Sequence, residues 1–391
     1  MDDIAKILVV DDEPFNIDYL EQELEDLGYS TLNASNGKEA LDVIEAESPD
    51  MILLDIMMPV MDGFEVLKRL KAEPSWRDIP VVVISAMDDM DSIAKGIELG
   101  AEDYLPKPFE PILLHARLKA GLEKKRLRDL EQHYLQALER ELEIGREIQR
   151  DFLPAEIIQP EGWEIAAAFQ AAREVAGDFY DVFQLPGGRI GLILGDVCDK
   201  GVGSALYMAL FRSLLRAASD PPSSTEYESD RTSDDYAILL NDAVQLVNDY
   251  ICNVHASANY CTLFFGALDP ASGDLSYIVA GHELPIVLRS SGEMMILNRT
   301  GPVVGLIEDA EFDVEEIQME TDDLLIVYSD GFPDLTNLEG EVFGKERFLN
   351  LIKLPSTSAD SIVGEILKET SSFSTGTSQF DDMTMLAVLK Q

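Results

Sequence analysis

Residues 51–63 read MILLDIMMPVMDG, in which a run of four apolar residues ends at a single acid, Asp55. Residues 7–13 read ILVVDDE, where four apolar residues run into Asp11 and Asp12. Short, continuous apolar runs are typical of strands buried on both faces of a parallel sheet. Because ligands of such sheets lie beyond the carboxyl ends of the strands, the sequence predicts that these carboxylates meet at one sheet edge.

The same pattern extends through the first 121 residues. Weaker or similar apolar runs at residues 30–32, 81–84 and 103–105 alternate with amphipathic stretches such as NIDYLEQELEDLG (16–28). Strand runs that alternate with helical patterns indicate successive βαβ units. Residues 1–121 are therefore predicted to form an α/β domain with a doubly wound, five-stranded parallel sheet.

Two more strand ends of this sheet carry polar groups. The fourth run ends at Ser85, and Lys107 follows the fifth. Carboxylates crowded at one edge repel each other unless a cation neutralises them, so a Mg²⁺ site is the economical explanation. Lys107 would place a positive charge, and Ser85 a hydroxyl donor, where a phosphoryl group could bind.

The segments VVDDE, LLDIMMPVMDG, ISA and KPF occur in this order, and through them residues 5–121 resemble the receiver domain of two-component response regulators. The resemblance implies that Asp55 accepts a phosphoryl group from a sensor histidine kinase or a phosphotransfer protein. The alternative is a degenerate receiver that serves only for docking. The resemblance also implies a Mg²⁺ site made by Asp11, Asp12, Asp55 and the Met57 carbonyl, and a switch made by Ser85, Tyr104 and Lys107.

Residues 122–154 differ in composition from the rest of this strongly acidic chain. They contain eight acids and seven bases, one glycine and no proline before Pro154. Apolar residues recur there at spacings of two to four, which indicates an amphipathic helix with an irregular heptad pattern. Such a helix could pack on a neighbouring domain, but we favour a parallel coiled-coil linker that joins two chains in a homodimer. Its apolar positions are Leu127, Leu130, Tyr134, Leu138, Leu142, Ile144, Ile148 and Phe152.

Residues 155–391 have a different architecture. Runs such as WEIAAAFQ, RIGLILG, YCTLFFGAL and MTMLAVL read as strands, many of them joined by short turns, and two long helical patterns lie among them. Consecutive strands with paired helices predict an α+β domain with two antiparallel sheets flanked by helices.

Aspartates recur at the strand–loop junctions of this region. A single Asp after a strand is usually a turn former, but here four separate junctions carry one, three of them beside Gly. Clustered carboxylates suit two hard divalent ions, which can activate water for attack on phosphorus. Neither a Cys-x5-Arg loop nor a G-x-S-x-G elbow is present, so no protein nucleophile of those kinds is predicted. The aspartates at these four junctions are Asp178, Asp181, Asp196, Asp199, Asp330, Asp381 and Asp382.

The segments ELEIGREIQRDFLP, EVAGDFYD, GDVCDKGVGSAL, AGHELP, YSDG and FDDMTML resemble the metal-dependent protein phosphatase (PPM, protein phosphatase 2C-like) superfamily, in its SpoIIE-type branch of serine/threonine phosphatases. The resemblance implies two Mn²⁺ or Mg²⁺ ions bridged by Asp196, with the Val197 carbonyl beside it. Asp330 and Asp381 would complete the ligands of the second ion, and Asp178 would act largely through metal-bound water.

Other polar residues of these motifs are interpreted differently. Asp181, Asp199 and Asp382 are expected behind the ligands or in turns, and His282 in AGHELP is either a turn residue or an acid near the substrate. Val197 stands where the superfamily often has glycine, and valine at this position is typical of the SpoIIE-type branch.

Together these features predict a response regulator in which phosphorylation of Asp55 controls hydrolysis of phosphoserine or phosphothreonine on a partner protein. The resemblance favours an anti-sigma-factor antagonist of the STAS type as the substrate. The alternative function is a catalytically silent, phosphatase-like domain that binds or sequesters a signalling partner.

Composition narrows the range of partners. The chain has 74 acids against 30 bases, a net charge of −44. Such a balance argues against nucleic acid and against anionic membranes, both of which need clustered Lys and Arg. Three cysteines are too few for a disulfide framework, and the beginning MDDIAKILVV lacks the basic region of a signal peptide. We therefore expect a cytoplasmic protein that binds neither nucleic acid nor membranes.

Overall fold

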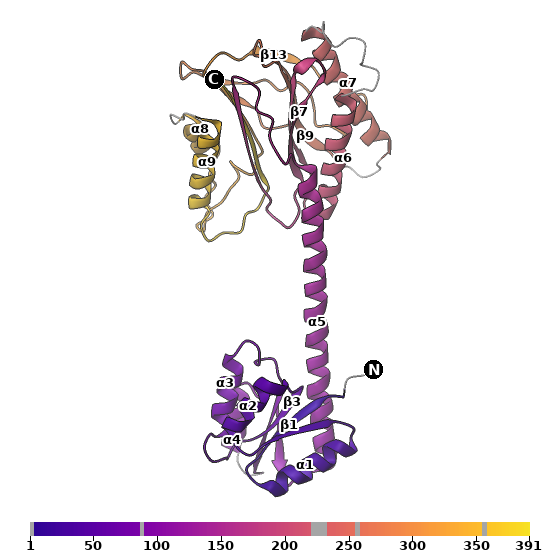
Figure 1. Ribbon diagram of the computed structural model, residues 1–391, viewed down its shortest axis with the longest axis vertical. Helices are drawn as coiled ribbons and strands as arrows, with labels where there is room; N and C mark the ends of the chain where they lie inside the picture. The colour runs from indigo at the N-terminus through magenta and orange to yellow at the C-terminus, as the bar shows by residue number, and fades with distance from the viewer. Residues whose placement is uncertain (1–3, 87–89, 220–232, 255–258, 354–357) are drawn as a thin grey trace. The chain divides into compact units, whose positions relative to one another are not determined.

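The computed structural model describes residues 4–86, 90–219, 233–254, 259–353 and 358–391. The chain divides into two compact units, Met1–Leu138 and Glu139–Gln391, and the boundary falls within one helix, α5 (Pro111–Phe152; Figure 1). The change of composition near residue 122 therefore does not coincide with the beginning of a helix. Leu114 and Leu118 at the N-terminal end of α5 are buried in the first unit.

The first unit is a five-stranded parallel sheet of order β2-β1-β3-β4-β5, which confirms the predicted doubly wound domain. The helices α1 and α5 pack on one face and α2 and α3 on the other. The strands are β1 (Lys6–Val10), β2 (Ser30–Ala34), β3 (Met51–Asp55), β4 (Val81–Ala86) and β5 (Asp103–Lys107), and the other helices are α1 (Pro14–Asp26), α2 (Gly37–Glu47), α3 (Gly63–Ala72) and α4 (Met90–Glu98).

The strand order places β1 and β3 at the centre of this sheet, where the direction of winding changes. Residues 51–55 are all buried, as are residues 7–10, which explains why both strands are apolar throughout. Crevices at such a switch point are the usual ligand sites of doubly wound sheets. Asp11 and Asp55 lie at this crevice because they end or follow the two central strands.

The second unit contains two five-stranded antiparallel sheets between two pairs of helices, as predicted (Figure 1). The first sheet has the order β13 (Glu315–Gln318), β10 (Asp274–Ala280), β9 (Cys261–Leu268), β8 (Ile190–Val197) and β7 (Asp178–Gln184), and α6 (Val202–Ser219) and α7 (Ser233–Val254) cover it. The second sheet has the order β12 (Met294–Ile296), β11 (Ile286–Leu288), β14 (Leu324–Tyr328), β15 (Met383–Lys390) and β6 (Trp163–Gln170), and α8 (Lys345–Ile352) and α9 (Ala359–Phe373) cover it.

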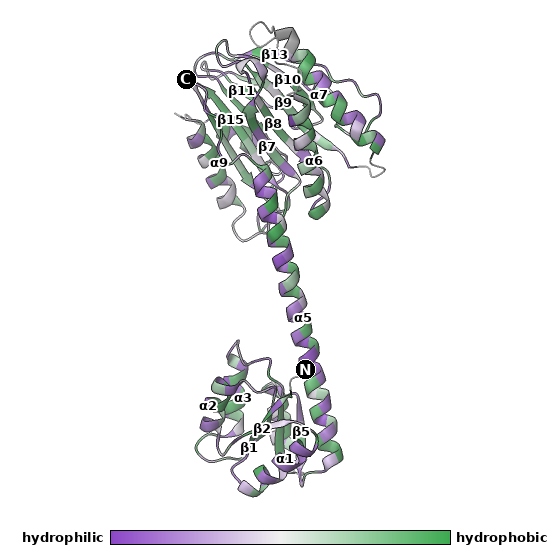
Figure 2. Ribbon diagram, turned by 45° about the vertical axis from the view of Figure 1, so that its right-hand side comes forward, coloured by the Kyte–Doolittle hydropathy of each residue, from purple (hydrophilic) through white to green (hydrophobic). Residues whose placement is uncertain are grey.

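Alternation along the strands builds three apolar layers in this unit. On β8, Ile193 faces the α6–α7 layer, whereas Leu192 and Leu194 face the other sheet. On β9, Phe265 and Phe264 divide in the same way. Successive side chains of a strand point to opposite faces, so a central strand must be apolar on both. Figure 2 accordingly shows the strands of both sheets mainly in the hydrophobic colour.

The predicted linker region lies within α5 as far as Phe152, where the helix ends, and hydrophilic and hydrophobic residues alternate along it (Figure 2). Leu127, Leu130 and Tyr134 of its apolar stripe are 58%, 65% and 68% exposed in the single chain. Phe152, at the other end, packs against the α6–α7 layer. The coiled-coil linker itself stays a prediction. Among the described residues, no helix combines the length and the apolarity that crossing a bilayer requires.

Candidate active sites and metal centres

The first candidate centre lies at the carboxyl ends of β1 and β3. Oxygen atoms of Asp11, Asp12 and Asp55 all lie within 4.8 Å of one another. Asp11 and Asp55 are buried, whereas Asp12 is exposed. The Nζ of Lys107 lies 2.8 Å from Asp11 Oδ2 and 2.5 Å from Asp55 Oδ2. The structure thus brings together three predicted metal ligands and the predicted lysine.

Electrostatics at this centre are balanced by that lysine. Burial raises the pKa of Asp55, and the hydrogen bond and charge of Lys107 offset part of the rise. Burial alone would lower the pKa of Lys107, but its hydrogen bonds to Asp11 and Asp55 outweigh this effect and raise it. Lys107 therefore remains a cation at neutral pH and holds a positive charge against one carboxylate oxygen of Asp55.

Residues 57–63 shape the backbone that follows Asp55. The Met57 N–H donates to Asp55 Oδ1 at 3.1 Å, and the Met57 side chain is 74% exposed. A Cβ at Gly63 would collide with the Asp55 carbonyl oxygen. Gly63 is therefore required for α3 to begin directly against the end of β3.

The two predicted switch residues lie on the neighbouring strands. Ser85 is buried on β4, with its Oγ 3.4 Å from the Ala86 carbonyl oxygen. Tyr104 is partly buried on β5, pairs in register with Val83, and has its ring centroid 5.8 Å from the Arg117 guanidinium carbon. Both residues therefore lie on strands adjacent to the centre, in the order that the sequence predicted.

The second candidate centre draws its carboxylates from both sheets of the second unit. Asp178 and Asp196 are directly opposed in the β7–β8 ladder. Asp330 follows β14 and Asp381 precedes β15, and these two strands are neighbours in the other sheet. Asp196 interacts with Asp178, Asp330 and Asp381, so the four aspartates form one group whose charges act on one another, here called the aspartate cluster.

This cluster is short of positive charge. Burial, and then the charges of Asp196 and Asp382, raise the pKa of Asp178 well above its usual value. Burial, and then Asp330, raise the pKa of Asp196 to about 7, while burial and Asp381 raise that of Asp330 to about 6. Asp178 Oδ2 is buried and makes no hydrogen bond to the residues that the structure describes. Divalent ions would remove this repulsion and give Asp178 Oδ2 a partner, so the donor set fits a metal centre.

Val197 contributes a backbone oxygen next to the cluster. A Cβ at Gly177 would lie 2.7 Å from the Val197 carbonyl oxygen, which is closer than side chains tolerate. Gly177 thus lets the segment before β7 approach that carbonyl.

Two residues around the cluster were not assigned ligand or catalytic roles from the sequence. Asp382 is buried and accepts hydrogen bonds from the Ala172 and Gly177 N–H groups, each at 2.7 Å. It therefore holds the loop that precedes Asp178. Lys200 Nζ lies 3.0 Å from Asp381 Oδ2. Lys200 could have been identified from the sequence, because it is the positively charged residue of the GDVCDKG motif (195–201).

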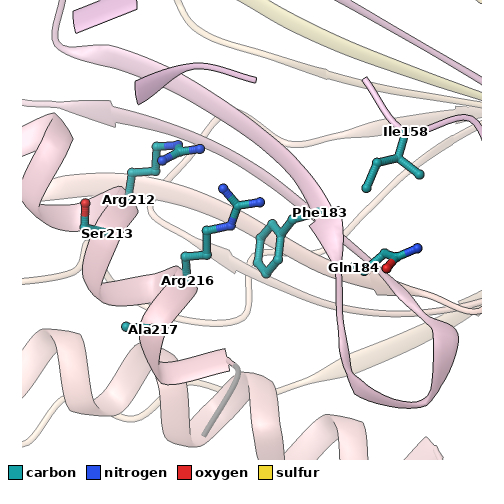
Figure 3. A pocket seen from close by; sticks show the side chains of 7 residues that line it. All are labelled: Ile158, Phe183, Gln184, Arg212, Ser213, Arg216 and Ala217. Carbon is teal, nitrogen blue, oxygen red and sulfur yellow. The ribbon is translucent and has the colours of Figure 1, made fainter. Parts of the chain in front are cut away.

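Asp181 belongs to a different environment, on the helix-covered face of β7. Its buried carboxylate lies 3.0 Å from Arg212 and 3.7 Å from Arg216, both on α6. These arginines line an open hollow of about 670 Å³, and Arg216 lies over the ring of Phe183 at 4.9 Å (Figure 3). Asp181 is therefore the β7 partner of a strand–helix ion-pair group. It is not part of the aspartate cluster.

His282 is buried inside the second unit. Its Nδ1 lies 2.7 Å from Thr262 Oγ1, and Thr262 is the register partner of Asp196. Burial lowers the pKa of His282 to about 4, so the imidazole is neutral at physiological pH. Of the two roles considered for it, the geometry favours the turn residue over a cationic acid.

Comparisons with known proteins agree with this division. The family model for stage II sporulation protein E (SpoIIE) matches residues 186–390, and the response regulator receiver domain model matches residues 7–119. Protein IcfG of Synechocystis sp. is 39% identical over 262 residues, which cover 64% of this chain and 41% of that protein. The alkaline phosphatase synthesis transcriptional regulatory protein PhoP of Bacillus subtilis is 43% identical over 122 residues, which cover 31% of this chain and 50% of that protein. The chain thus spans half or less of the length of these curated relatives.

The solved structure of the SiaA-PP2C domain of Pseudomonas aeruginosa superposes with a TM-score of 0.53 at 19% identity, and covers 65% of this chain and 97% of that one. At this identity the likeness shows the fold alone. The SpoIIE model, in contrast, matches more than half of the sequence. The chain belongs to the SpoIIE family and combines that domain with a response regulator receiver domain.

Proposed function

We propose that this protein is a response regulator in which phosphorylation of Asp55 controls a metal-dependent protein serine/threonine phosphatase. The observation that carries the proposal is the pair of carboxylate centres, one in each unit. The receiver centre contains a single acceptor beside a lysine. The second centre contains four aspartates from two sheets.

In the receiver, Asp55 is the proposed acceptor of a phosphoryl group from a sensor histidine kinase or phosphotransfer protein. Asp11, Asp12, Asp55 and the Met57 carbonyl would hold Mg²⁺, which supplies neutralising charge for the incoming phosphoryl group. Lys107 forms an ion pair with the acceptor carboxylate in the structure, and it is available to pair with a phosphoryl oxygen after transfer. Ser85 and Tyr104 are the proposed switch residues that respond to the new group.

In the second unit, Asp178, Asp196, Asp330, Asp381 and the Val197 carbonyl would hold two Mn²⁺ or Mg²⁺ ions. Bound there, the ions supply charge neutralisation and activated water for hydrolysis of a phosphate monoester. The contribution of the chain is positional. Asp382 fixes the loop before Asp178, and Lys200 adds a positive charge beside Asp381 at a centre that receives an anionic substrate.

The proposed substrate is phosphoserine or phosphothreonine on an anti-sigma-factor antagonist of the STAS type, as the resemblance implied. We further propose a homodimer through α5, because an exposed apolar stripe on a helix is stabilised when a second copy covers it. The alternative, a silent domain that sequesters a partner, is disfavoured by the four aspartates. Repelling carboxylates that are buried, as Asp178 is, or partly buried, as the other three are, are costly to keep without a cation to bind.

The direct test is a Mn²⁺-dependent assay on a phosphoserine-bearing STAS protein, with and without acetyl phosphate as the phosphoryl donor. We expect turnover that depends on added metal and changes when Asp55 is phosphorylated. Tight binding of the phosphoprotein without release of phosphate would instead support the sequestering function.

A further inference from the structure

Gln149 is a buried polar residue on a largely exposed part of α5. It is 6% exposed, whereas its neighbours Ile148 and Arg150 are exposed. Its side-chain amide pairs with both backbone groups of Ala176. The Gln149 Nε2 donates to the Ala176 carbonyl oxygen at 2.6 Å, and the Ala176 N–H donates to Gln149 Oε1 at 2.9 Å.

Ala176 is two residues before Asp178, in the loop that joins β6 to β7. This segment has no regular structure, and other parts of the chain hold its backbone in place. Asp382 accepts from the Ala172 and Gly177 N–H groups, and Gln149 holds Ala176 between them. The backbone immediately ahead of a proposed metal ligand is therefore fixed from two directions by side-chain hydrogen bonds.

Apolar packing at this place is incomplete. α5 and α6 leave a hollow of about 190 Å³ that is lined by Phe152, Val175 and Leu206, with Gln149 among its walls. Contacts across a hollow do not define one position, because they tolerate small displacements. Paired hydrogen bonds do define one, because they weaken steeply with distance and angle.

We propose that Gln149 is a positioning residue for the metal centre of the second unit, which fixes Ala176 and thereby the place of Asp178. The inference rests on the proposed function. Groups that orient metal ligands without touching the metal change affinity by about 10- to 100-fold when they are removed. The link also makes α5 an element on which the affinity of the centre for divalent ions depends.

The test compares two full-length variants with the wild-type protein. Gln149→Met keeps an unbranched side chain of similar length but can form neither hydrogen bond. Arg150→Met introduces the same side chain at the next, exposed position and is the matched control. Binding of Mn²⁺ is measured by titration calorimetry, and the Asp196→Ala variant identifies the part of the signal that belongs to the second unit.

We expect the Mn²⁺ dissociation constant of the second unit to rise at least about tenfold in Gln149→Met and to stay unchanged in Arg150→Met. Hydrogen–deuterium exchange in residues 172–178 should also accelerate in Gln149→Met only. A receiver that still accepts a phosphoryl group from acetyl phosphate in both variants shows that the effect is local.

An unchanged dissociation constant in a folded Gln149→Met protein would overturn the inference and leave the proposed phosphatase intact. If that variant does not fold, Gln149→Glu replaces it, since Glu keeps the acceptor for the Ala176 N–H and loses the donor to the Ala176 carbonyl. Its dissociation constant should also rise, and a wild-type value would again overturn the inference. Wild-type binding by Asp196→Ala would contradict the proposed metal centre itself.

Discussion

The two carboxylate centres of this chain differ in how the negative charge of their aspartates is offset. In the receiver, Lys107 lies 2.8 Å from Asp11 and 2.5 Å from Asp55. In the second unit, Lys200 lies 3.0 Å from Asp381, and the pKa values of Asp196 and Asp330 still rise to about 7 and about 6. The receiver thus has its own counter-charge close to the acceptor, whereas the second centre depends on protons or metal ions from solution.

The largest expected effect tests the acceptor of the lysine-balanced centre. Asp55→Asn should take up no phosphoryl group from acetyl phosphate, because an amide is not a nucleophile for phosphorus under these conditions. Phosphate-affinity electrophoresis measures the uptake. Asp62→Asn is the matched control, since Asp62 caps α3 from an exposed position and asparagine caps equally well. Labelling of Asp55→Asn at the wild-type level would refute the assignment.

The metal-dependent centre should respond to loss of one ligand by about 10² in turnover or more, because an ion and its activated water are lost together. Asp196→Asn is the variant, and release of phosphate from a phosphoserine substrate is the measurement. Asp199→Asn, an exposed aspartate of the same loop, should retain turnover. Equal turnover in the two variants would show that the chemistry lies elsewhere in the molecule.

A third prediction concerns the connection between the centres. Leu138→Pro should break α5 at a cost of about 3 kcal/mol or more. Basal phosphatase activity should then persist while the response to acetyl phosphate is lost, and light scattering should show a weaker dimer. A proline variant that responds like the wild-type protein, or a wild-type monomer at micromolar concentration, would argue against signalling through this helix.

The smallest expected effect is on stability without metal. The raised pKa values of Asp196 and Asp330 mean that the folded second unit binds more protons than the unfolded chain between about pH 4 and 7. The contribution of these two groups to stability is therefore fully present below this window and is lost as the pH rises through the folded-state values. In chelator, calorimetry should show its unfolding temperature about 5 °C lower near pH 8 than near pH 5. Added Mn²⁺ should reverse the loss, and an unfolding temperature that rises with pH would contradict this account.

Sequence reasoning identified the strands of the receiver because each central strand is a continuous apolar run. It did not identify β11, β12 and β13, which have three, three and four residues. Segments this short carry no readable periodicity, and the sheet that surrounds them decides their structure. The pair α8 and α9 was also missed, although the buried residues Ile362, Val363 and Ile366 of α9 have a helical spacing that is readable in the sequence.

The candidate centres show the same division between local and distant information. Asp178, Asp196, Asp330 and Asp381 could be proposed from sequence because each lies at a strand–loop junction, in a segment that resembles a motif of the phosphatase superfamily. The role of Gln149 could not be proposed, because its partner Ala176 is 27 residues away in the chain. Asp382 was expected behind the ligands or in a turn, but its partner Gly177, 205 residues away, could not be identified. A polar residue in an amphipathic helix or a second Asp beside the first is unremarkable until the fold places a backbone group against it.

Asp178 and Asp196 are directly opposed in the β7–β8 ladder, and this pairing limits which deletions the hairpin can tolerate. Side chains of a strand alternate between faces, so Asp178 and Asp181, three residues apart, serve the aspartate cluster and the α6 arginines respectively. Deleting one residue from the turn between these strands, where Gly187 and Gly188 have positive φ, would exchange the two faces of β7. Both the metal ligand and the ion-pair partner of α6 would be lost in one event. The length of this hairpin turn must therefore be kept as strictly as the identity of the aspartates.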